Sequence, residues 1–326
     1  MSCKLRLIRN LILLGLPLLF MMVYLALKPM DYLTLEYPMW AEEKQLVTGK
    51  GEQVRDYDRL IIGDSRAKSG VMPAVLDESG NTYNIAIGGC TPIEMYYALD
   101  RYLKAHEPPK SVFIIFAPYH FYDIDNYNQT LYYNYLSVGQ IVETAKEARG
   151  LMGEEKVAYK GWITDVISYK LRFPSKYLAA FYESLPGGNG EANRERLAQV
   201  RDELGFTLFG TEESNNEPSY EVHEEAFKRS ELLIKYFERL LDRLQEEGVE
   251  VTIEQGPLNP VSYDSIKPEF IDGYMEFLDQ ISERYPEITV VKELPRYEAD
   301  CFGDNNHLNR RGALKFTEAL KERYNL

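Results

Sequence analysis

Five short apolar runs alternate with helical segments along the chain, and this alternation limits the fold more than any other feature. Apolar residues fill the runs without a polar face, as in strands that are covered on both sides of a parallel sheet. The sequence therefore predicts an α/β domain with a five-stranded parallel sheet. The predicted strands are Asp58–Gly63, Tyr83–Ile87, Ser111–Ala117, Val249–Glu254 and Ile288–Val291.

Helices are predicted between these strands, and two of them carry clear start signals. Thr91 is followed by Pro92 and, three residues on, by Glu94, a capping-box pattern that predicts a helix through about His106. Asn309 caps a predicted final helix at Arg310–Tyr324, and two amphipathic stretches, Glu224–Glu247 and Pro268–Tyr285, flank the fourth strand.

A long interruption, about residues 124–222, separates the third and fourth strands. A stretch of this length is too long for a bare loop inside a domain. Its periodic segments Val138–Ala148 and Ala192–Leu204 predict a helical insertion over the sheet edge.

Near the N-terminus, residues 11–27 contain no charged side chain, and Lys4, Arg6 and Arg9 precede them. An apolar run of this length suits a transmembrane helix, and the basic flank predicts that the rest of the chain lies outside the cytoplasm. The alternative is a cleaved signal peptide, but the small-x-small cleavage pattern is missing after the run. We therefore predict a membrane anchor (residues 1–30), a polar connector (31–55) and a catalytic domain (56–326) with its insertion.

Composition narrows the classes of partner and cofactor. The 326 residues carry a formal net charge of -14, which argues against nucleic acid as a partner. Four scattered histidines and three cysteines match no zinc-binding spacing, and no phosphate-binding glycine loop is recognisable. We therefore expect neither a metal nor another cofactor.

Two distant segments carry the chemistry. Ser65 directly follows the first strand, and Asp304 stands three residues before His307 in the loop ahead of the final helix. The carboxyl ends of parallel strands share one edge of a sheet, so we expect these three residues to meet there. A serine becomes nucleophilic when a base removes its proton and a third group orients that base. The alternative for Ser65 alone is a simple helix cap.

With these segments the chain resembles the SGNH (GDSL-like) hydrolase superfamily. Gly63-Asp64-Ser65 is similar to its first block, and Asp304-Asn305-Asn306-His307 to its last. The resemblance implies a flavodoxin-like three-layer α/β/α fold with Ser65 as nucleophile, His307 as base and Asp304 as acid. The segment around Gly88 and Gly89 is similar to the second block, so backbone N–H groups of Ser65 and these glycines would form the oxyanion hole.

The third block departs from the family pattern. That family has an Asn there as a further oxyanion donor, but this chain reads Phe116-Ala117-Pro118-Tyr119-His120-Phe121. Losing such a donor costs about a hundredfold in rate. Either Tyr119 or His120 replaces it, or His120 only packs beside the site. Arg66 is a further candidate lining residue.

The N-terminal anchor and the Asp-x-x-His-Leu-Asn ending resemble a membrane-anchored branch that acylates cell surfaces. That branch includes the D-alanyl transfer protein of teichoic acids and alginate-type O-acetylation proteins. The resemblance implies an extracytoplasmic serine acyltransferase or esterase that acts on a surface glycopolymer, beside a multi-pass membrane O-acyltransferase. The alternative is a non-catalytic scaffold of a membrane acylation complex.

Cys90 and Cys301 both flank candidate site loops. Two exported cysteines near one rim can form a disulfide. The alternative, which we favour slightly, is that each is a small buried residue that fills space.

Overall fold

The computed structural model describes residues 3–27, 37–51, 54–122, 135–156, 182 and 185–326. By contacts between Cα atoms the chain falls into two compact units. One unit comprises Met1–Tyr37 with Thr130–Asn193, and the other comprises Pro38–Gln129 with Arg194–Leu326. All residues of the candidate site belong to the second unit, which contains the sheet.

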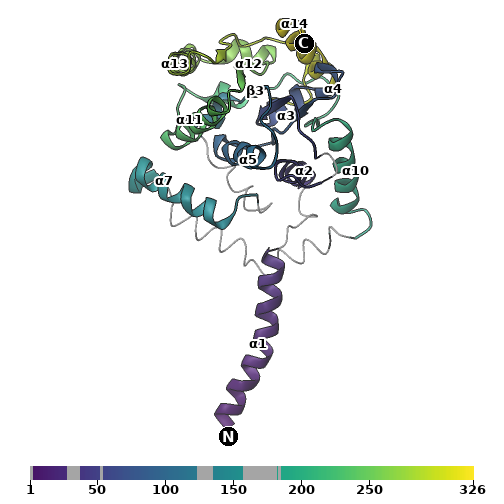
Figure 1. Ribbon diagram of the computed structural model, residues 1–326, viewed down its shortest axis with the longest axis vertical. Helices are drawn as coiled ribbons and strands as arrows, with labels where there is room; N and C mark the ends of the chain where they lie inside the picture. The colour runs from purple at the N-terminus through teal and green to yellow at the C-terminus, as the bar shows by residue number, and fades with distance from the viewer. Residues whose placement is uncertain (1–2, 28–36, 52–53, 123–134, 157–181, 183–184) are drawn as a thin grey trace. The chain divides into compact units, whose positions relative to one another are not determined.

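Five parallel strands form this sheet in the order β2-β1-β3-β4-β5. The central strand, β3, is labelled in Figure 1. The predicted α/β class and all five strands are therefore confirmed, with ends shifted by up to three residues. Pairing is in register from Arg59 opposite Ser111 to Gly63 opposite Ile115. The strands are β1 (Arg59–Gly63), β2 (Thr82–Asn84), β3 (Ser111–Ile115), β4 (Glu250–Ile253) and β5 (Thr289–Val290).

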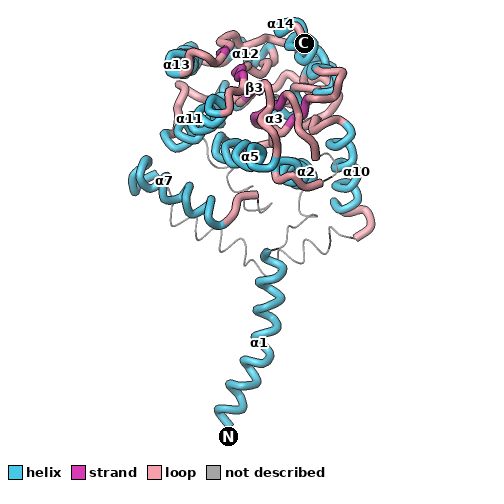
Figure 2. Tube along the Cα trace, in the orientation of Figure 1, coloured by secondary structure: helices cyan, strands magenta, loops and turns pink. Residues whose placement is uncertain are grey.

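Helices alternate with the strands along the trace (Figure 2). The capping box at Thr91 is present as predicted, with the Glu94 carboxylate accepting the Thr91 backbone N–H at 2.7 Å. Asn309 caps the last helix by accepting the Gly312 N–H at 3.0 Å. The helices of the sheet-containing unit are α2 (Tyr37–Val47), α3 (Ser65–Gly70), α4 (Pro73–Leu76), α5 (Pro92–Ala105), α11 (Glu231–Glu246), α12 (Pro260–Ser265), α13 (Pro268–Arg284) and α14 (Arg310–Tyr324), with the short 3-10 helices η1 (Pro118–Phe121), η2 (Tyr220–His223) and η3 (Ala299–Cys301).

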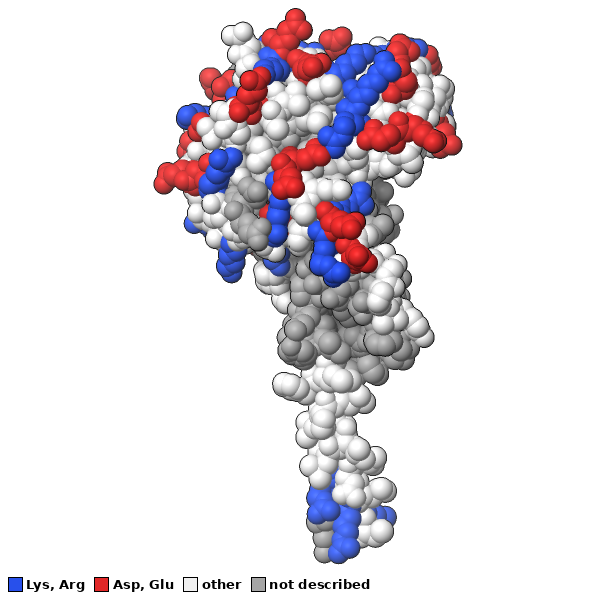
Figure 3. Space-filling view, turned by 90° about the vertical axis from the view of Figure 1, so that its right-hand side faces the viewer, with Lys and Arg blue, Asp and Glu red and all other residues white. Residues whose placement is uncertain are grey.

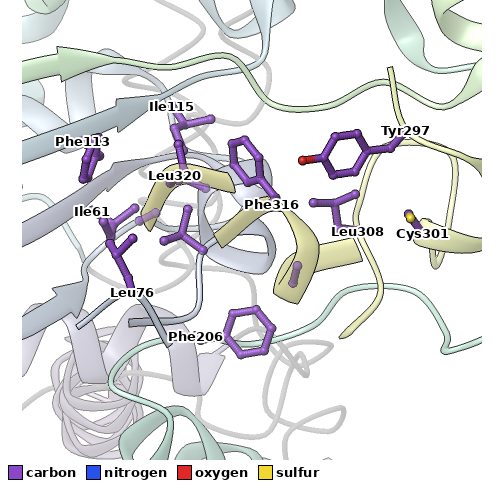
Figure 4. Packing of buried hydrophobic residues seen from close by; sticks show 14 of the residues in the cluster. Ile61, Leu76, Phe113, Ile115, Phe206, Tyr297, Cys301, Leu308, Phe316 and Leu320 are labelled. Atoms are coloured by element: carbon purple, nitrogen blue, oxygen red, sulfur yellow. The ribbon is translucent and has the colours of Figure 1, made fainter. Parts of the chain in front are cut away.

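One face of the sheet is covered by α3, α4 and α14, and α5 packs with α11. Ile61 and Ile115 point into a cluster that Phe316 and Leu320 of α14 complete (Figure 4). Because side chains alternate along a strand, Leu60 and Ile62 lie on the opposite face. All four strand residues are wholly buried, so this apolar burial fixes β1 and the residues that follow it.

The predicted connector over residues 31–55 contains a helix, α2, which the sequence pattern did not reveal. Trp40 is buried on it, and so are the carboxylates of Glu42 and Glu43. Charged residues at buried positions hide the apolar stripe by which an amphipathic helix is recognised.

The long insertion contains both helices that the periodicity predicted. Val138–Ala148 begins α7 (Val138–Lys156), and Ala192–Leu204 overlaps α10 (Asn189–Asp202), which spans the boundary between the two units. Residues 123–134 and 157–181 of the insertion lie outside the described residues.

Residues 3–27 form the N-terminal helix α1, whose residues 11–27 are those predicted to span a membrane. Within the described part of the chain, no helix meets the length and hydropathy needed to cross a bilayer.

The two inner cysteines are free, so the alternative in which they fill buried space holds and no bridge joins them. The Cys90 thiol donates to the Gly63 carbonyl at 3.0 Å. Cys301 lies beside Tyr297 at the edge of the core cluster (Figure 4).

Candidate active site

Ser65 is the first residue of α3, and only Asp64 separates it from the end of β1 at Gly63. The turn between them depends on Gly63, whose φ of +148° is open to glycine. A Cβ at this position would lie 1.8 Å from the Ile115 carbonyl oxygen, so no other residue fits. The tight turn places the serine at the carboxyl edge of the sheet, where ligands bind in open α/β folds.

Asp64 anchors this turn with both carboxylate oxygens. Oδ1 accepts the Arg66 N–H at 2.8 Å and so caps α3, while Oδ2 accepts the Ala117 N–H at 2.6 Å. The second bond ties the nucleophile turn to the segment after β3. Asp64 is wholly buried, and we therefore assign it a structural part in holding Ser65.

The predicted acid and base lie in a narrow loop between η3 and α14. Phe302 and Leu308 pair as an antiparallel bridge, and the Gly303 N–H donates to the His307 carbonyl at 2.9 Å. Inside the loop, Asp304 Oδ1 accepts the backbone N–H groups of Asn306 and His307, both at 2.8 Å. Backbone amides of the loop itself thus hold the Asp304 carboxylate in place, in addition to its contact with the His307 side chain.

Ser65, His307 and Asp304 meet as predicted. His307 Nε2 is 2.7 Å from Ser65 Oγ, and His307 Nδ1 is 2.7 Å from Asp304 Oδ2. Because Nδ1 faces a carboxylate it carries the ring proton, which leaves Nε2 as the acceptor for the serine hydroxyl. The three residues thus form one chain of hydrogen-bond contacts, which is the arrangement that a serine nucleophile, its base and an orienting acid require.

Electrostatics keep the acid ionised. Partial burial on its own would raise the pKa of Asp304, but the hydrogen bond and charge of His307 and the two loop amides lower that pKa below its ordinary value. An ionised Asp304 can orient His307 and stabilise the imidazolium that forms when the serine proton is taken.

The two candidate oxyanion glycines differ. The Gly88 N–H donates to Met39 Sδ of α2 at 3.2 Å, and Gly88 is buried. Gly89 is partly exposed and adopts a φ of +69°. In the arrangement seen here, the N–H of Gly88 is therefore directed at a methionine, and Gly89 is the better placed of the two to meet a ligand.

Tyr119 and His120 occupy different places on η1. The His120 imidazole is wholly buried, with Nε2 3.4 Å from Asp64 Oδ2, and its ring centre lies 4.2 Å from that of Tyr119 with the two rings tilted by 38°. Tyr119 is half-buried, and burial together with the charge of Asp64 raises its pKa well above the usual range. His120 thus packs against the nucleophile turn, in keeping with the alternative that it lies beside the site.

Two residues near the site were not identified from the sequence, Phe209 and Met39. The Phe209 ring lies 4.9 Å from the His307 ring, and its edge would be 2.9 Å from a Cβ at Gly88. It belongs to an irregular segment, Leu204–Glu221, that we call the strap. No periodic pattern marks such a segment, because its contacts rather than its local sequence fix its path.

The strap is attached along the sheet edge by backbone hydrogen bonds. Its Leu204 carbonyl accepts the Asn84 N–H at 3.0 Å, the Thr211 N–H donates to Gly303 at 3.0 Å, and the Asn215 N–H donates to Phe302 at 3.1 Å. It therefore runs from the end of β2 to the loop that carries Asp304 and His307.

The described residues contain no group of three His, Cys, Asp or Glu side chains arranged to hold a metal ion.

Comparison with known proteins gives little beyond this geometry. A model of an uncharacterised protein family matches residues 192–325, which is less than half of the chain. The match includes the strap, Asp304 and His307, but not Ser65. A search of curated proteins found no match.

Proposed function

We propose that this chain is a serine acyltransferase or esterase of the SGNH type. The observation that carries the proposal is the unbroken chain of contacts from Ser65 Oγ through His307 to Asp304. Ser65 at the start of α3 and Asp304 in the loop before α14 are 239 positions apart in sequence (304 minus 65), and His307 connects them. The strand order β2-β1-β3-β4-β5 is the order of flavodoxin-like doubly wound sheets, and it supports that fold for this chain.

The reaction follows from the contacts. His307 takes the proton of Ser65 as the oxygen attacks an ester carbonyl, and the tetrahedral intermediate collapses to an acyl-serine as His307 returns the proton to the leaving alcohol. A second alcohol or a water molecule then gives up its proton to His307 and attacks the acyl group. The bond between the acyl carbon and Ser65 Oγ breaks, His307 returns the proton to that oxygen, and the new ester or the free acid leaves. Backbone N–H groups of Ser65 and Gly89 are the proposed oxyanion donors.

For substrate and location we propose a surface glycopolymer acylated outside the cytoplasm, with α1 as membrane anchor and a multi-pass O-acyltransferase as partner. The apolar side chains of α1, such as Leu14 and Phe20, are exposed, which favours an apolar environment for this helix. On the face drawn in Figure 3, a short diagonal run of basic side chains is bordered by acidic ones. The formal net charge of -14 argues against nucleic acid as a partner.

A non-catalytic scaffold in an acylation complex remains the second candidate. Two observations favour it: the Gly88 N–H is taken by Met39, and the third block offers a buried histidine in place of an asparagine donor. A scaffold, however, gives no reason for the short contact between His307 and Ser65.

Hydrolysis of p-nitrophenyl acetate by the full-length chain separates the two candidates. We expect turnover that Ser65→Ala abolishes, and diversion of the acetyl group to glycerol, added as a polyol acceptor, would mark a transferase. Equal rates for the parent chain and Ser65→Ala would reject the serine mechanism and leave the scaffold.

A further inference from the structure

Arg66 follows the nucleophile directly, and its side chain is almost wholly buried at 4% exposure. We infer that Arg66 is a positioning residue, which holds the loop carrying Asp304 and His307 in register with Ser65. This inference rests on the proposed serine mechanism and assigns the arginine no contact with the substrate.

The contacts of Arg66 lead directly to the acid–base loop. Its Nη2 donates to Asn306 Oδ1 at 3.1 Å. Asn306 stands between the acid and the base in sequence, and its own backbone N–H donates to Asp304 Oδ1 at 2.8 Å. One residue thus joins the arginine through its side chain and the catalytic acid through its backbone.

These bonds close a ring. Helix α3 carries both Ser65 and Arg66, so it is connected to the acid–base loop twice, once through Ser65–His307 and once through Arg66–Asn306. The first connection is broken during the reaction, because an acylated Ser65 has no proton to donate to His307. The second does not take part in proton transfer. It therefore holds the loop in place while the acyl-serine waits for its acceptor.

The strap supplies the charge that keeps Arg66 in this position. Glu221 Oε1 lies 2.6 Å from Arg66 Nη2, and the Glu221 side chain is only 1% exposed. Burial alone would lower the pKa of Arg66, but the Glu221 carboxylate, together with nearby Tyr119 and Asp64, outweighs burial and raises that pKa above the usual value. An unpaired buried guanidinium would be costly, so Glu221 fixes the side chain beside the loop.

Space around the arginine is restricted as well. A Cβ at Gly256 would lie 3.2 Å from Arg66 Cδ, and the Tyr119 ring centre is 5.9 Å from Arg66 Cζ. The side chain thus lies between Gly256 after the end of β4, Tyr119 of η1 and Glu221 of the strap.

The test measures how fast a fluorophosphonate probe labels Ser65 in the full-length chain, because labelling requires a serine that His307 has activated. We expect Arg66→Met to slow labelling about a hundredfold, as a small displacement of a catalytic group does. Arg66→Lys, which keeps a positive donor, should restore part of the rate. Arg201→Met is the matched control, since it removes an arginine whose partner is Glu42 of α2 at 2.7 Å rather than the acid–base loop.

Asn306→Ala keeps the test decisive if Arg66→Met does not fold, because it leaves the backbone N–H to Asp304 in place. It should slow labelling to the same extent, and the Arg66→Met/Asn306→Ala double variant should be no slower than either single one. Folded variants that label at the parent rate would overturn the positioning role. Failure of the parent chain itself to label would instead reject the serine mechanism.

Discussion

Helix α14 has a polar cluster at each end, and the carboxylates of the two clusters differ in exposure and in hydrogen-bond partners. Before its N-terminus, Asp304 is 31% exposed and faces a histidine that bonds a serine hydroxyl. At its C-terminus, Glu254 is wholly buried and accepts two bonds from Arg323, at 2.9 and 3.0 Å, and one from the Tyr324 hydroxyl at 2.5 Å. The contacts of Asp304 lead through His307 to a serine hydroxyl that can react. The contacts of Glu254 include the guanidinium of Arg323, which stays charged.

This difference separates a cluster suited to chemistry from one suited to stability. A catalytic relay has to change its protonation while substrate reaches it, so it keeps partial exposure and a neutral base. A buried carboxylate paired with arginine stabilises the fold only while it stays ionised, so removing one partner mainly lowers the stability of the folded state.

The largest expected effect concerns the first cluster. Ser65→Ala and His307→Ala should each lower kcat for ester hydrolysis about ten-thousandfold, and Asp304→Asn should act similarly because the histidine loses its orientation. The Ser65→Ala/His307→Ala double variant should lose little more, since the residues act as a unit. Thermal unfolding midpoints should stay near the parent value. If these variants lost stability but kept their turnover, the cluster around Asp304 would be structural rather than catalytic.

The second cluster should respond in the opposite way. Glu254→Ala leaves Arg323 and Tyr324 without their shared acceptor and should lower the free energy of unfolding by about 2 kcal/mol. We expect kcat per folded molecule to stay within about twofold, because Glu254 has no contact with the triad among the described residues. Urea unfolding and turnover are measured on the same preparation of Glu254→Ala. A lower kcat with an unchanged free energy of unfolding would contradict both expectations.

A pH-dependent effect concerns Lys68, a buried residue of α3 whose Nζ donates to the Asn84 carbonyl at 2.9 Å. Burial lowers its pKa to about 7 from 10.5, although Glu43 and Glu42 oppose the shift. Between these two values the unfolded chain binds a proton that the folded chain does not, so this residue makes stability rise with pH from 7 to 10.5.

The slope contributed by Lys68 should approach about 1.4 kcal/mol per pH unit, and Lys68→Met should remove it. Urea unfolding of both proteins at pH 7, 8 and 9 provides the measurement. Parallel curves for the two proteins would show that Lys68 keeps its proton when folded.

Much of this arrangement could be predicted from the sequence. The five apolar runs predict the sheet, and the carboxyl-edge rule brings Ser65 to Asp304 and His307, because strand burial and parallel topology are encoded locally. The caps at Thr91 and Asn309 follow from side-chain chemistry alone.

The sequence did not reveal the residues that surround the triad. Met39, Phe209 and Glu221 come from α2 and the strap, where no period distinguishes a buried side chain from an exposed one. Their positions depend on contacts with distant backbone, such as the bonds from the strap to Gly303. The pairing of Arg66 with Glu221 is likewise a tertiary event that no local motif indicates.

If His307 activates Ser65, a serine-reactive probe should trap Ser65 covalently at a rate that depends on His307. The full-length chain is incubated with a fluorophosphonate, digested, and mapped by mass spectrometry. The account predicts one phosphonylated residue, Ser65, with labelling at least about a hundredfold slower in His307→Ala. Labelling of a different serine, or of Ser65 at equal rates with and without His307, would contradict it.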